Sequence, residues 1–158
     1  MTLPVLDFQQ LIKNSPLFAI DFVVLNELNQ VLIGQRKNAP AQGFWFVPGG
    51  RVFKNESLEQ AFVRLSQAEL GVKVQRQQAQ MLGLYDHFYE DSFFSDSIST
   101  HYINAAHYVK LHDFDLNLPL EQHQEYRWVS LDGLARDETI HNFSKVFLPD
   151  LQIVLDRM

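Results

Sequence analysis

The stretch of residues 48–72 most limits how this chain folds, because it marks both ends of a helix. Residues 48–50, Pro-Gly-Gly, stop the short apolar run before them. Ser57, with Gln60 three residues later, has the pattern of a capping box that begins a helix. Gly71 has the place of the residue just beyond the helix C-terminus. The pattern therefore predicts a strand end, a glycine-rich loop and a helix that finishes before Gly71.

Apolar and alternating runs predict strands on both sides of this stretch. They cover residues 17–25, 31–36, 44–47, 80–89, 102–111 and 126–129. Short helices are predicted over residues 6–13 and 131–135, and from residue 142 to the C-terminus. Strands and helices in mixed order favour a single α+β or α/β sandwich domain over residues 1–158, and not a regular βαβ repeat.

Composition excludes several classes of site and partner. The 158-residue chain has no cysteine, which excludes disulfides, thiolate metal sites and cysteine nucleophiles. Its formal net charge of −6 gives no general surface for nucleic acid. No apolar stretch is long enough to span a bilayer, and the first residues lack the pattern of a secretory signal. We therefore expect a cytoplasmic protein without nucleic-acid or membrane partners.

The predicted helix carries a carboxylate on its apolar face. At about 100° per residue, one stripe of the helix holds Leu58, Ala61, Phe62 and Leu65. Glu69 falls near the middle of this stripe. A buried carboxylate needs a cation or hydrogen-bond donors. Glu69 is therefore either a metal ligand or a side chain that reaches water from a frayed helix end.

Arg51 and Arg64 are candidate phosphate ligands in the same stretch. Arg51 follows two glycines, which let the backbone approach a ligand closely, and its guanidinium matches phosphate oxygens. Arg64 lies on a flank of the predicted helix, where it contacts a phosphate or pairs with Glu56. Neither signal is specific when it stands alone.

The spacing of these residues resembles the Nudix box, the loop–helix–loop signature of enzymes that hydrolyse nucleoside diphosphates linked to another group. The signature is G-x5-E-x7-R-E-U-x-E-E-x-G-U, where U is a bulky aliphatic residue. The matching positions are Gly50, Glu56, Arg64, Glu69, Gly71 and Val72. Leu65 and Ala68 replace two glutamates, and Ser66 replaces an aliphatic residue. Glu69 is thus the one glutamate left of the three at the helix end.

These departures resemble the GDP-mannose mannosyl hydrolase branch of the Nudix family, which breaks the carbon–oxygen bond of the sugar. Three further stretches resemble the same branch: PAQGFWFVPGGRV, HFYEDSF with a following THY, and EQHQEYRW. The resemblance covers most of the chain, up to Trp128. It implies the Nudix fold, a mixed β-sheet flanked by helices.

Attack at carbon suits a helix with few carboxylates. Nudix enzymes that attack phosphorus use several glutamates to hold several divalent ions. Attack at the anomeric carbon needs a base that activates water on the face opposite the leaving group. A nucleoside diphosphate already leaves as a weak base, so one Mg²⁺, or Mn²⁺ in its place, and arginines are enough to stabilise its charge.

The resemblance implies a metal site and a general base. The Mg²⁺ ligands are the Gly49 carbonyl, the Glu69 carboxylate and the side-chain oxygen of Gln122. His123 is the general base that deprotonates water. An unperturbed histidine has a pKa of about 6.5, which suits a base near neutral pH.

The resemblance also implies the contacts to the substrate. The departing diphosphate is stabilised by Arg36, Arg51 and Arg64, and by a hydrogen bond from Tyr102. The remaining substrate contacts are Asp21 near the sugar, His87, and Phe8 as a candidate stacking surface for guanine.

Each of these assignments has a structural alternative. Without the resemblance, His123 is a solvated loop histidine and Arg36 is a surface charge at a strand end. Asp21 stands in an apolar strand, where it binds a ligand or makes a buried hydrogen bond. Tyr102 and His87 are otherwise aromatic core residues with satisfied polar tips, an interpretation slightly favoured for His87.

Three functions follow from these residues. The first is Mg²⁺-dependent hydrolysis of GDP-mannose, with GDP-glucose as a second candidate, to GDP and free hexose with inversion. The second is hydrolysis of the phosphoanhydride bond of nucleoside diphosphate sugars, against which the missing glutamates argue. The third is a degenerate Nudix domain that only binds a nucleotide sugar, against which the retained metal ligands and base argue. The branch is homodimeric, so the resemblance also implies a homodimer.

Overall fold

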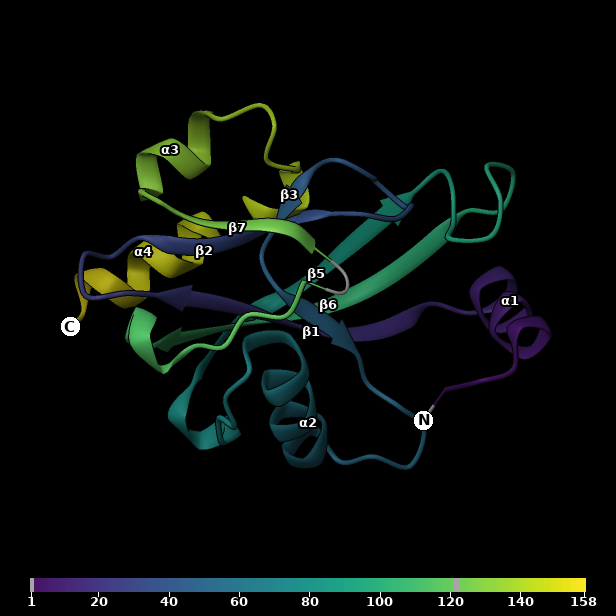
Figure 1. Cartoon of the computed structure of the whole chain (residues 1–158), viewed down its shortest axis with the longest axis horizontal. Coiled ribbons are helices and arrows are strands. Elements are labelled where there is room, and N and C mark those ends of the chain that lie inside the picture. Colours follow the sequence, from purple (N-terminus) through teal and green to yellow (C-terminus); the bar gives the residue numbers. More distant parts are fainter. Residues whose placement is uncertain (1, 121–122) are drawn as a thin grey trace.

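The computed structural model describes residues 2–120 and 123–158, which form a mixed seven-stranded β-sheet with helices on both faces (Figure 1). The strand order is β3-β2-β1-β6-β5, with β4 paired to β1 and β7 paired to β2. The bounds are β1 Leu17–Leu25, β2 Val31–Arg36, β3 Trp45–Phe46, β4 Gly49–Arg51, β5 Gln80–Tyr89, β6 Thr100–Lys110 and β7 His123–Val129. The predicted α/β sandwich is confirmed.

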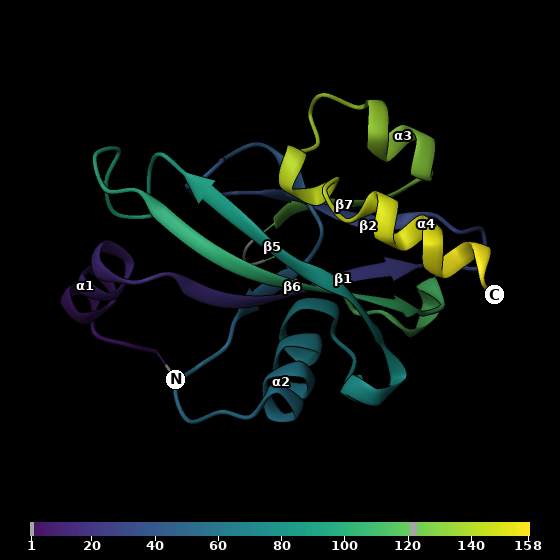
Figure 2. The ribbon, with the colours of Figure 1, turned by 180° about the vertical axis from the view of Figure 1, so that it is seen from behind.

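Helices cover the two faces of the sheet, and each face has its own apolar core (Figures 1 and 2). Helix α2, Leu58–Leu70, packs on one face against alternate residues of β1 such as Phe22. Helices α3, Leu131–Arg136, and α4, Leu148–Asp156, cover the other face, where Val23 of β1 contributes. Because β1 is buried on both faces, its sequence is a nearly continuous apolar run.

Strand β1 uses its two edges differently. Along one edge it pairs in parallel with β6 over its whole length, from Leu17↔Tyr102 to Leu25↔Lys110. The other edge is divided. Its end meets β2 at Leu25↔Val31, whereas its first half pairs with β4 from Ala19↔Arg51 to Asp21↔Gly49. The sheet therefore opens between β4 and β2.

The N-terminal helix closes one end of the molecule. Helix α1, Val5–Asn14, lies beside the start of β1 and beside the β5–β6 loop (Figures 1 and 2). Its Phe8 ring meets Phe94 of that loop edge to face, with ring centroids 5.6 Å apart. Among the described residues, no helix is long and apolar enough to cross a membrane.

The capping signals of the long helix are confirmed. The Ser57 hydroxyl accepts a hydrogen bond from the backbone nitrogen of Gln60, and the side-chain oxygen of Gln60 accepts one from the backbone nitrogen of Ser57. Gly71 ends the helix with φ of 70°. The chain between β1 and β2 makes a polar turn, in which the Asn26 side chain accepts hydrogen bonds from the backbone nitrogens of Leu28 and Gln30.

Three predicted boundaries were wrong, two because a partner from elsewhere in the chain decides them and one because of a proline. Gly49 and Gly50 do not end the extended chain but begin β4, because the first half of β1 offers them a free edge. The last strand begins at His123, three residues before the predicted start, because β2 continues to Arg36 opposite it. The predicted C-terminal helix is broken into η3, Asn142–Ser144, and α4, whose first turn contains a proline. Two further short helices, η1 Arg76–Gln78 and η2 Asp113–Asp115, had no sequence signal.

Replacing Gly71 by alanine is expected to lower the free energy of unfolding by about 2–5 kcal/mol. The residue has φ of 70°, and a Cβ there would lie 2.0 Å from the Asn117 carbonyl oxygen. Gly43→Ala is the matched control, because Gly43 has φ of 87° but no atom within 4 Å of the added Cβ. The control should cost about 1–2 kcal/mol. Urea unfolding measures both, and equal losses would show that the clash with Asn117 does not matter.

Candidate active site

A cavity of about 440 Å³ lies where the sheet opens between β4 and β2. Strands β1, β5 and β6 form its floor, and α2 with β4 forms one wall. Phe8 of α1 and the loop residues 38–40 complete the lining. The cavity therefore draws on segments from most of the chain.

Ten of the residues predicted for the site line this one cavity. They are Phe8, Asp21, Arg36, Gly49, Arg51, Arg64, Glu69, His87, Tyr102 and His123. The predicted metal ligand Gln122 lies outside the described residues. The fold brings the others together from eight different elements, and their chemical roles remain predictions.

Glu69 and His123 face each other across the cavity. Glu69 Oε2 lies 3.9 Å from His123 Nε2, and the two residues are 5% and 6% exposed. The alternative of a frayed helix end in water is therefore wrong for Glu69. The alternative of a solvated loop is wrong for His123, which is the first residue of β7. Burial, helped by the charge of Arg36, lowers the pKa of His123 to about 4, so its imidazole is neutral at pH 7.

Gly34 of β2 makes room for the His123 ring. A Cβ at position 34 would lie 2.8 Å from both Cγ and Nδ1 of His123. The same Cβ would lie 3.1 Å from Cε1 of Tyr126. Any side chain at this position would displace the imidazole. Gly34 is thus a positioning residue that the sequence did not single out.

Asp21 sits on the floor beside an asparagine. Its Oδ1 accepts a hydrogen bond of 2.9 Å from Asn104 Nδ2 on the neighbouring strand β6. Removal from bulk water raises the pKa of Asp21 to about 7, although the hydrogen bond from Asn104 and the charge of Arg36 act in the opposite direction. Asn104 also lines the cavity. A polar side chain between Ile103 and Ala105 was the sequence signal for it, and that signal was missed.

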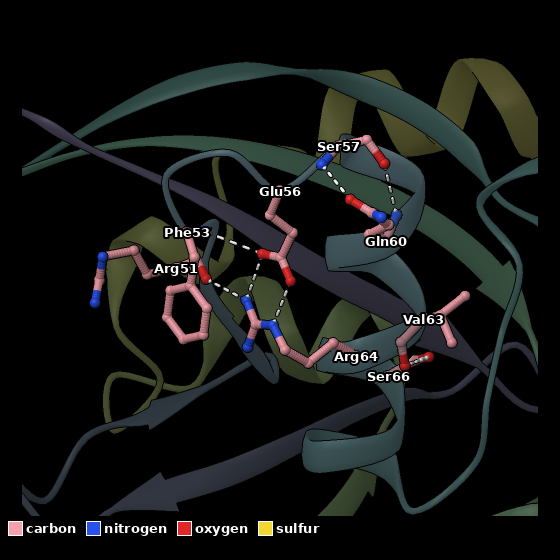
Figure 3. Close-up of polar contacts among 8 residues, drawn as sticks. All are labelled: Arg51, Phe53, Glu56, Ser57, Gln60, Val63, Arg64 and Ser66. Carbon is pink, nitrogen blue, oxygen red and sulfur yellow. Dashed lines mark hydrogen bonds and ion pairs between the residues drawn. The ribbon is translucent and has the colours of Figure 1, made fainter. Parts of the chain in front are cut away.

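Arg64 holds the loop between β4 and α2 (Figure 3). Its Nε donates to Glu56 Oε2 at 2.6 Å and its Nη2 donates to Glu56 Oε1 at 2.9 Å. The same Nη2 donates to the Arg51 carbonyl oxygen at 2.8 Å, and the Phe53 nitrogen donates to Glu56 at 3.0 Å. The ion pair that the sequence offered as an alternative to a phosphate contact is therefore present. Through it, Arg64 fixes the backbone that carries Arg51.

Aromatic rings hold the guanidinium groups in place. Arg36 lies over Phe46, 5.3 Å from the ring centroid. Arg51 lies 4.9 Å from the centroids of both Phe8 and Phe53. Such contacts restrict the long side chains and add a cation–π attraction. Two arginines are thus directed into the cavity before any anion arrives.

His87 and Tyr102 are neighbours on the floor, paired across β5 and β6. The His87 ring stacks on Phe143 with centroids 4.4 Å apart, and burial lowers its pKa to about 4. Its Nε2 is buried and has no hydrogen-bond partner among the described residues. His87 is thus packed like a core residue, as one interpretation predicted, but the expected hydrogen-bond partner of its polar tip is not found among the described residues. Burial raises the pKa of Tyr102, so its hydroxyl keeps its proton and can donate.

The residues that depart from the box have two different uses. Leu65 and Ala68 line the cavity where the signature has glutamates, and Leu65 packs so close to Gly50 that a Cβ there would lie 2.4 Å from Leu65 Cδ2. Ser66 is buried and does not line the cavity. Its hydroxyl donates to the Val63 carbonyl and accepts from the Val74 nitrogen at 2.9 Å. Ser66 is therefore structural, whereas the other two replacements remove charge from the cavity wall.

The donor set suits one hard cation. Two carboxylates line the cavity among the described residues, those of Asp21 and Glu69. The described residues contain no group of three or more His, Cys, Asp or Glu that could hold a metal ion. Mg²⁺ commonly takes one or two carboxylates and completes its shell with waters and phosphate oxygens. Glu69 with the Gly49 carbonyl fits this pattern and does not fit a cluster of ions.

Comparison with known proteins gives a family and several relatives. A family model described as NUDIX domain matches residues 16–151. The low-salt glycan biosynthesis protein Agl8 of Haloferax volcanii is 41% identical over 118 residues, which are 75% of this chain and 74% of that protein. A putative 8-oxo-dGTP diphosphatase of Bacillus subtilis is 47% identical over 49 residues, which are 31% of each protein.

Solved structures show the same fold. The MutT protein from Methanosarcina mazei Go1 aligns with a TM-score of 0.71 and 21% identity, over 90% of this chain and 97% of that one. The NUDIX domain of Shewanella oneidensis NrtR, solved with ADP ribose, aligns with a TM-score of 0.69 and 18% identity, over 90% of each chain. At such identities the likeness establishes the architecture alone.

Glu56→Gln is expected to lower the free energy of unfolding by about 1–2 kcal/mol at pH 7, after allowance for solvent screening. Hydrogen bonds from Arg64 hold the pKa of Glu56 below its ordinary value. The carboxylate therefore stabilises the fold fully above its unfolded pKa of about 4.3, and this contribution is lost as the pH falls through the lower folded pKa. Urea unfolding across this range should show wild type and variant converging in acid.

Glu59→Gln is the matched control for this measurement. Glu59 pairs with Arg76 at 2.7 Å, but its side chain is 66% exposed. Exposed ion pairs contribute little to stability. If Glu59→Gln lowered the free energy of unfolding as much as Glu56→Gln does, a special role for the Arg64–Glu56 pair would be contradicted.

Proposed function

The chain belongs to the NUDIX domain family, and from that premise we propose that it hydrolyses a GDP-hexose to GDP and free hexose. GDP-mannose is the first candidate substrate and GDP-glucose the second. Water attacks the anomeric carbon of the sugar, and the configuration at that carbon is inverted. The proposed enzyme is a homodimer, following the resemblance in its sequence.

The observation that carries the proposal is the wall formed by α2. Leu65 and Ala68 occupy the cavity side of this helix, which leaves Glu69 as its carboxylate there. Attack on phosphorus in a two-metal site needs carboxylates enough to hold both ions. Departure of a diphosphate from carbon needs its charge stabilised, which arginines and one ion can do. The wall formed by α2 supports attack at carbon better than attack on phosphorus.

The sequence relative in Haloferax volcanii gives independent support for a sugar nucleotide. Its printed name places that protein in glycan biosynthesis, and it is 41% identical to this chain. Glycan synthesis draws on activated sugars, so a nucleotide-linked hexose is a substrate class that both proteins would meet. The match to an 8-oxo-dGTP diphosphatase covers 31% of this chain and weighs less.

The NUDIX family generally uses divalent metal ions. The Gly49 carbonyl and Glu69 would hold Mg²⁺ or Mn²⁺, together with Gln122, which lies outside the described residues. When bound, the ion supplies positive charge to the oxygens of the diphosphate. Arg36 and Arg51, already directed into the cavity by aromatic rings, bind the same diphosphate.

The remaining residues act at the sugar. His123 Nε2 takes a proton from water, whose oxygen forms a bond to the anomeric carbon. The bond from that carbon to the diphosphate oxygen breaks, and its electron pair leaves with GDP. Tyr102 donates a hydrogen bond to the departing oxygens, and Asp21 contacts the sugar ring and supports positive charge that develops on it.

Hydrolysis of GDP-mannose in ¹⁸O-labelled water, with mass analysis of both products, tests the proposal. We expect the label in the free hexose and unlabelled GDP, because water attacks carbon. Label in a phosphate, with GMP as the nucleotide product, would mean that attack on phosphorus persists despite Leu65 and Ala68. Tight binding without any product would indicate a domain that only binds nucleotide sugars.

His123→Ala is expected to lower kcat by about 10²–10⁴-fold, the usual contribution of a general base. Gly34→Ala should lower kcat by about 10–100-fold, because its Cβ displaces the imidazole without removing it. Steady-state kinetics measures both, with thermal unfolding to confirm that the variants fold. His112→Ala is the control, since His112 is exposed and does not line the cavity. A kcat in His123→Ala within about threefold of wild type would remove His123 from the base role.

A further inference from the structure

Asn104 occupies the middle of the cavity floor. It lies on β6, opposite Tyr85 of β5 on one side and Ala19 of β1 on the other. Its side chain lines the cavity and is 6% exposed. Two residues further along the same face, Ala106 belongs to the apolar core under α4. Asn104 is therefore the last polar side chain of β6 before the floor becomes core.

The two ends of the Asn104 amide have different partners. Nδ2 donates to Asp21 Oδ1 at 2.9 Å. Above its raised pKa of about 7, the Asp21 carboxylate is ionised and only accepts hydrogen bonds, so this contact then turns the amide nitrogen towards Asp21 and the carbonyl away from it. Oδ1 is buried and has no hydrogen-bond partner among the described residues. A buried acceptor left unpaired costs about 1–3 kcal/mol, which natural proteins rarely tolerate without a use.

A second unpaired atom lies on the same floor. His87 Nε2, on β5, is buried without a partner among the described residues. His87 pairs with Tyr102, so it stands diagonally from Asn104 across the two strands, at a Cβ separation of roughly 7–8 Å. The floor thus has two unpaired buried polar atoms, one beside the Asp21 carboxylate and one on the neighbouring strand β5, which suits a ligand with several hydroxyl groups.

We propose that Asn104 determines the sugar specificity of this cavity: its Oδ1 accepts a hydrogen bond from one hydroxyl of the hexose, while its Nδ2 holds Asp21 against the same ring. The inference rests on the proposed function, since it assumes a nucleotide sugar. Asn104 Oδ1 only accepts hydrogen bonds, and so does an ionised phosphate oxygen. The two atoms therefore cannot form a hydrogen bond, which excludes the diphosphate from this position. One face of the neighbouring His87 ring is already covered by Phe143, and its buried edge nitrogen Nε2 is available to a hydroxyl.

The test compares wild type with Asn104→Ala on GDP-mannose and on its single-deoxy analogues. A site built to bind a hydroxyl rejects an analogue that lacks it by a large factor. Wild type should therefore prefer GDP-mannose over one deoxy analogue by about 100-fold or more in kcat/KM. In Asn104→Ala this preference should fall below about 10-fold for that analogue and stay unchanged for the others. Affinity for GDP, measured by calorimetry, should stay within about twofold of wild type.

Two further variants keep the result interpretable. Asn104→Ser serves if the alanine variant does not fold, because it is also too short to reach the hydroxyl. Thr100→Val removes another lining hydroxyl, but one that already donates to the Asp91 carbonyl at 2.8 Å. It should leave the preference among the analogues unchanged. An equal loss for every analogue in Asn104→Ala, or a matching loss of GDP affinity, would overturn the inference.

The calorimetry separates this inference from the proposed function. If wild type releases hexose from GDP-mannose but the preference survives in Asn104→Ala, the inference alone is wrong. If wild type releases no hexose, the proposed function is wrong, and binding decides the inference. Wild type must then bind GDP-mannose more tightly than GDP, and Asn104→Ala must lose about 10-fold or more of that difference. No difference in wild type would overturn the inference as well.

Discussion

The divided edge of β1 is the constraint from which the cavity follows. One edge of the strand is fully used by β6, whereas the other is shared between β2 at its end and β4 in its first half. A sheet with continuous pairing would have placed β2 beside Asp21 and closed the floor. Because β4 pairs there instead, the chain passes directly from the sheet into the loop that leads to α2. The floor, the arginine loop and Glu69 thereby come to face one space.

The loop that leads to α2 shows how a signature can lose part of its chemistry and keep its structure. Glu56, Arg64 and Gly71 fix the shape of the loop and the helix end through an ion pair and a left-handed cap. These positions match the signature. The positions that differ and face the cavity, Leu65 and Ala68, carry no hydrogen bonds that the fold needs. The fold therefore tolerates the loss of carboxylates there, and Leu65 instead joins the apolar core on this face of the sheet.

Local patterns predicted the elements that have local causes. The bounds of β1 and β2 follow from their apolar runs and the asparagine turn, and α2 follows from its two caps. The bounds of β4 and β7 were not predicted correctly, because pairing with distant segments sets the ends of these strands. No nearby residue signals this pairing. The site residues divide in the same way, into those that the sequence reveals and those that depend on contacts with distant segments. The helix stripe pointed to Glu69 and the resemblance supplied His123, whereas the contacts of Gly34 with His123 and of Asn104 with Asp21 run between strands, which spacing along the chain does not show.

An acidic protein that binds a diphosphate must concentrate its positive charge in one place. The chain has a formal net charge of −6, so long-range attraction does not bring the ligand in. Arg36 and Arg51 are instead held over aromatic rings, and the backbone of Arg51 is tied to Arg64. Side chains fixed beforehand lose little rotamer entropy when an anion binds. Three of the aromatic rings that line the cavity, those of Phe8, Phe46 and Phe53, hold these arginines, and under the proposed function this is how they contribute to binding of the diphosphate.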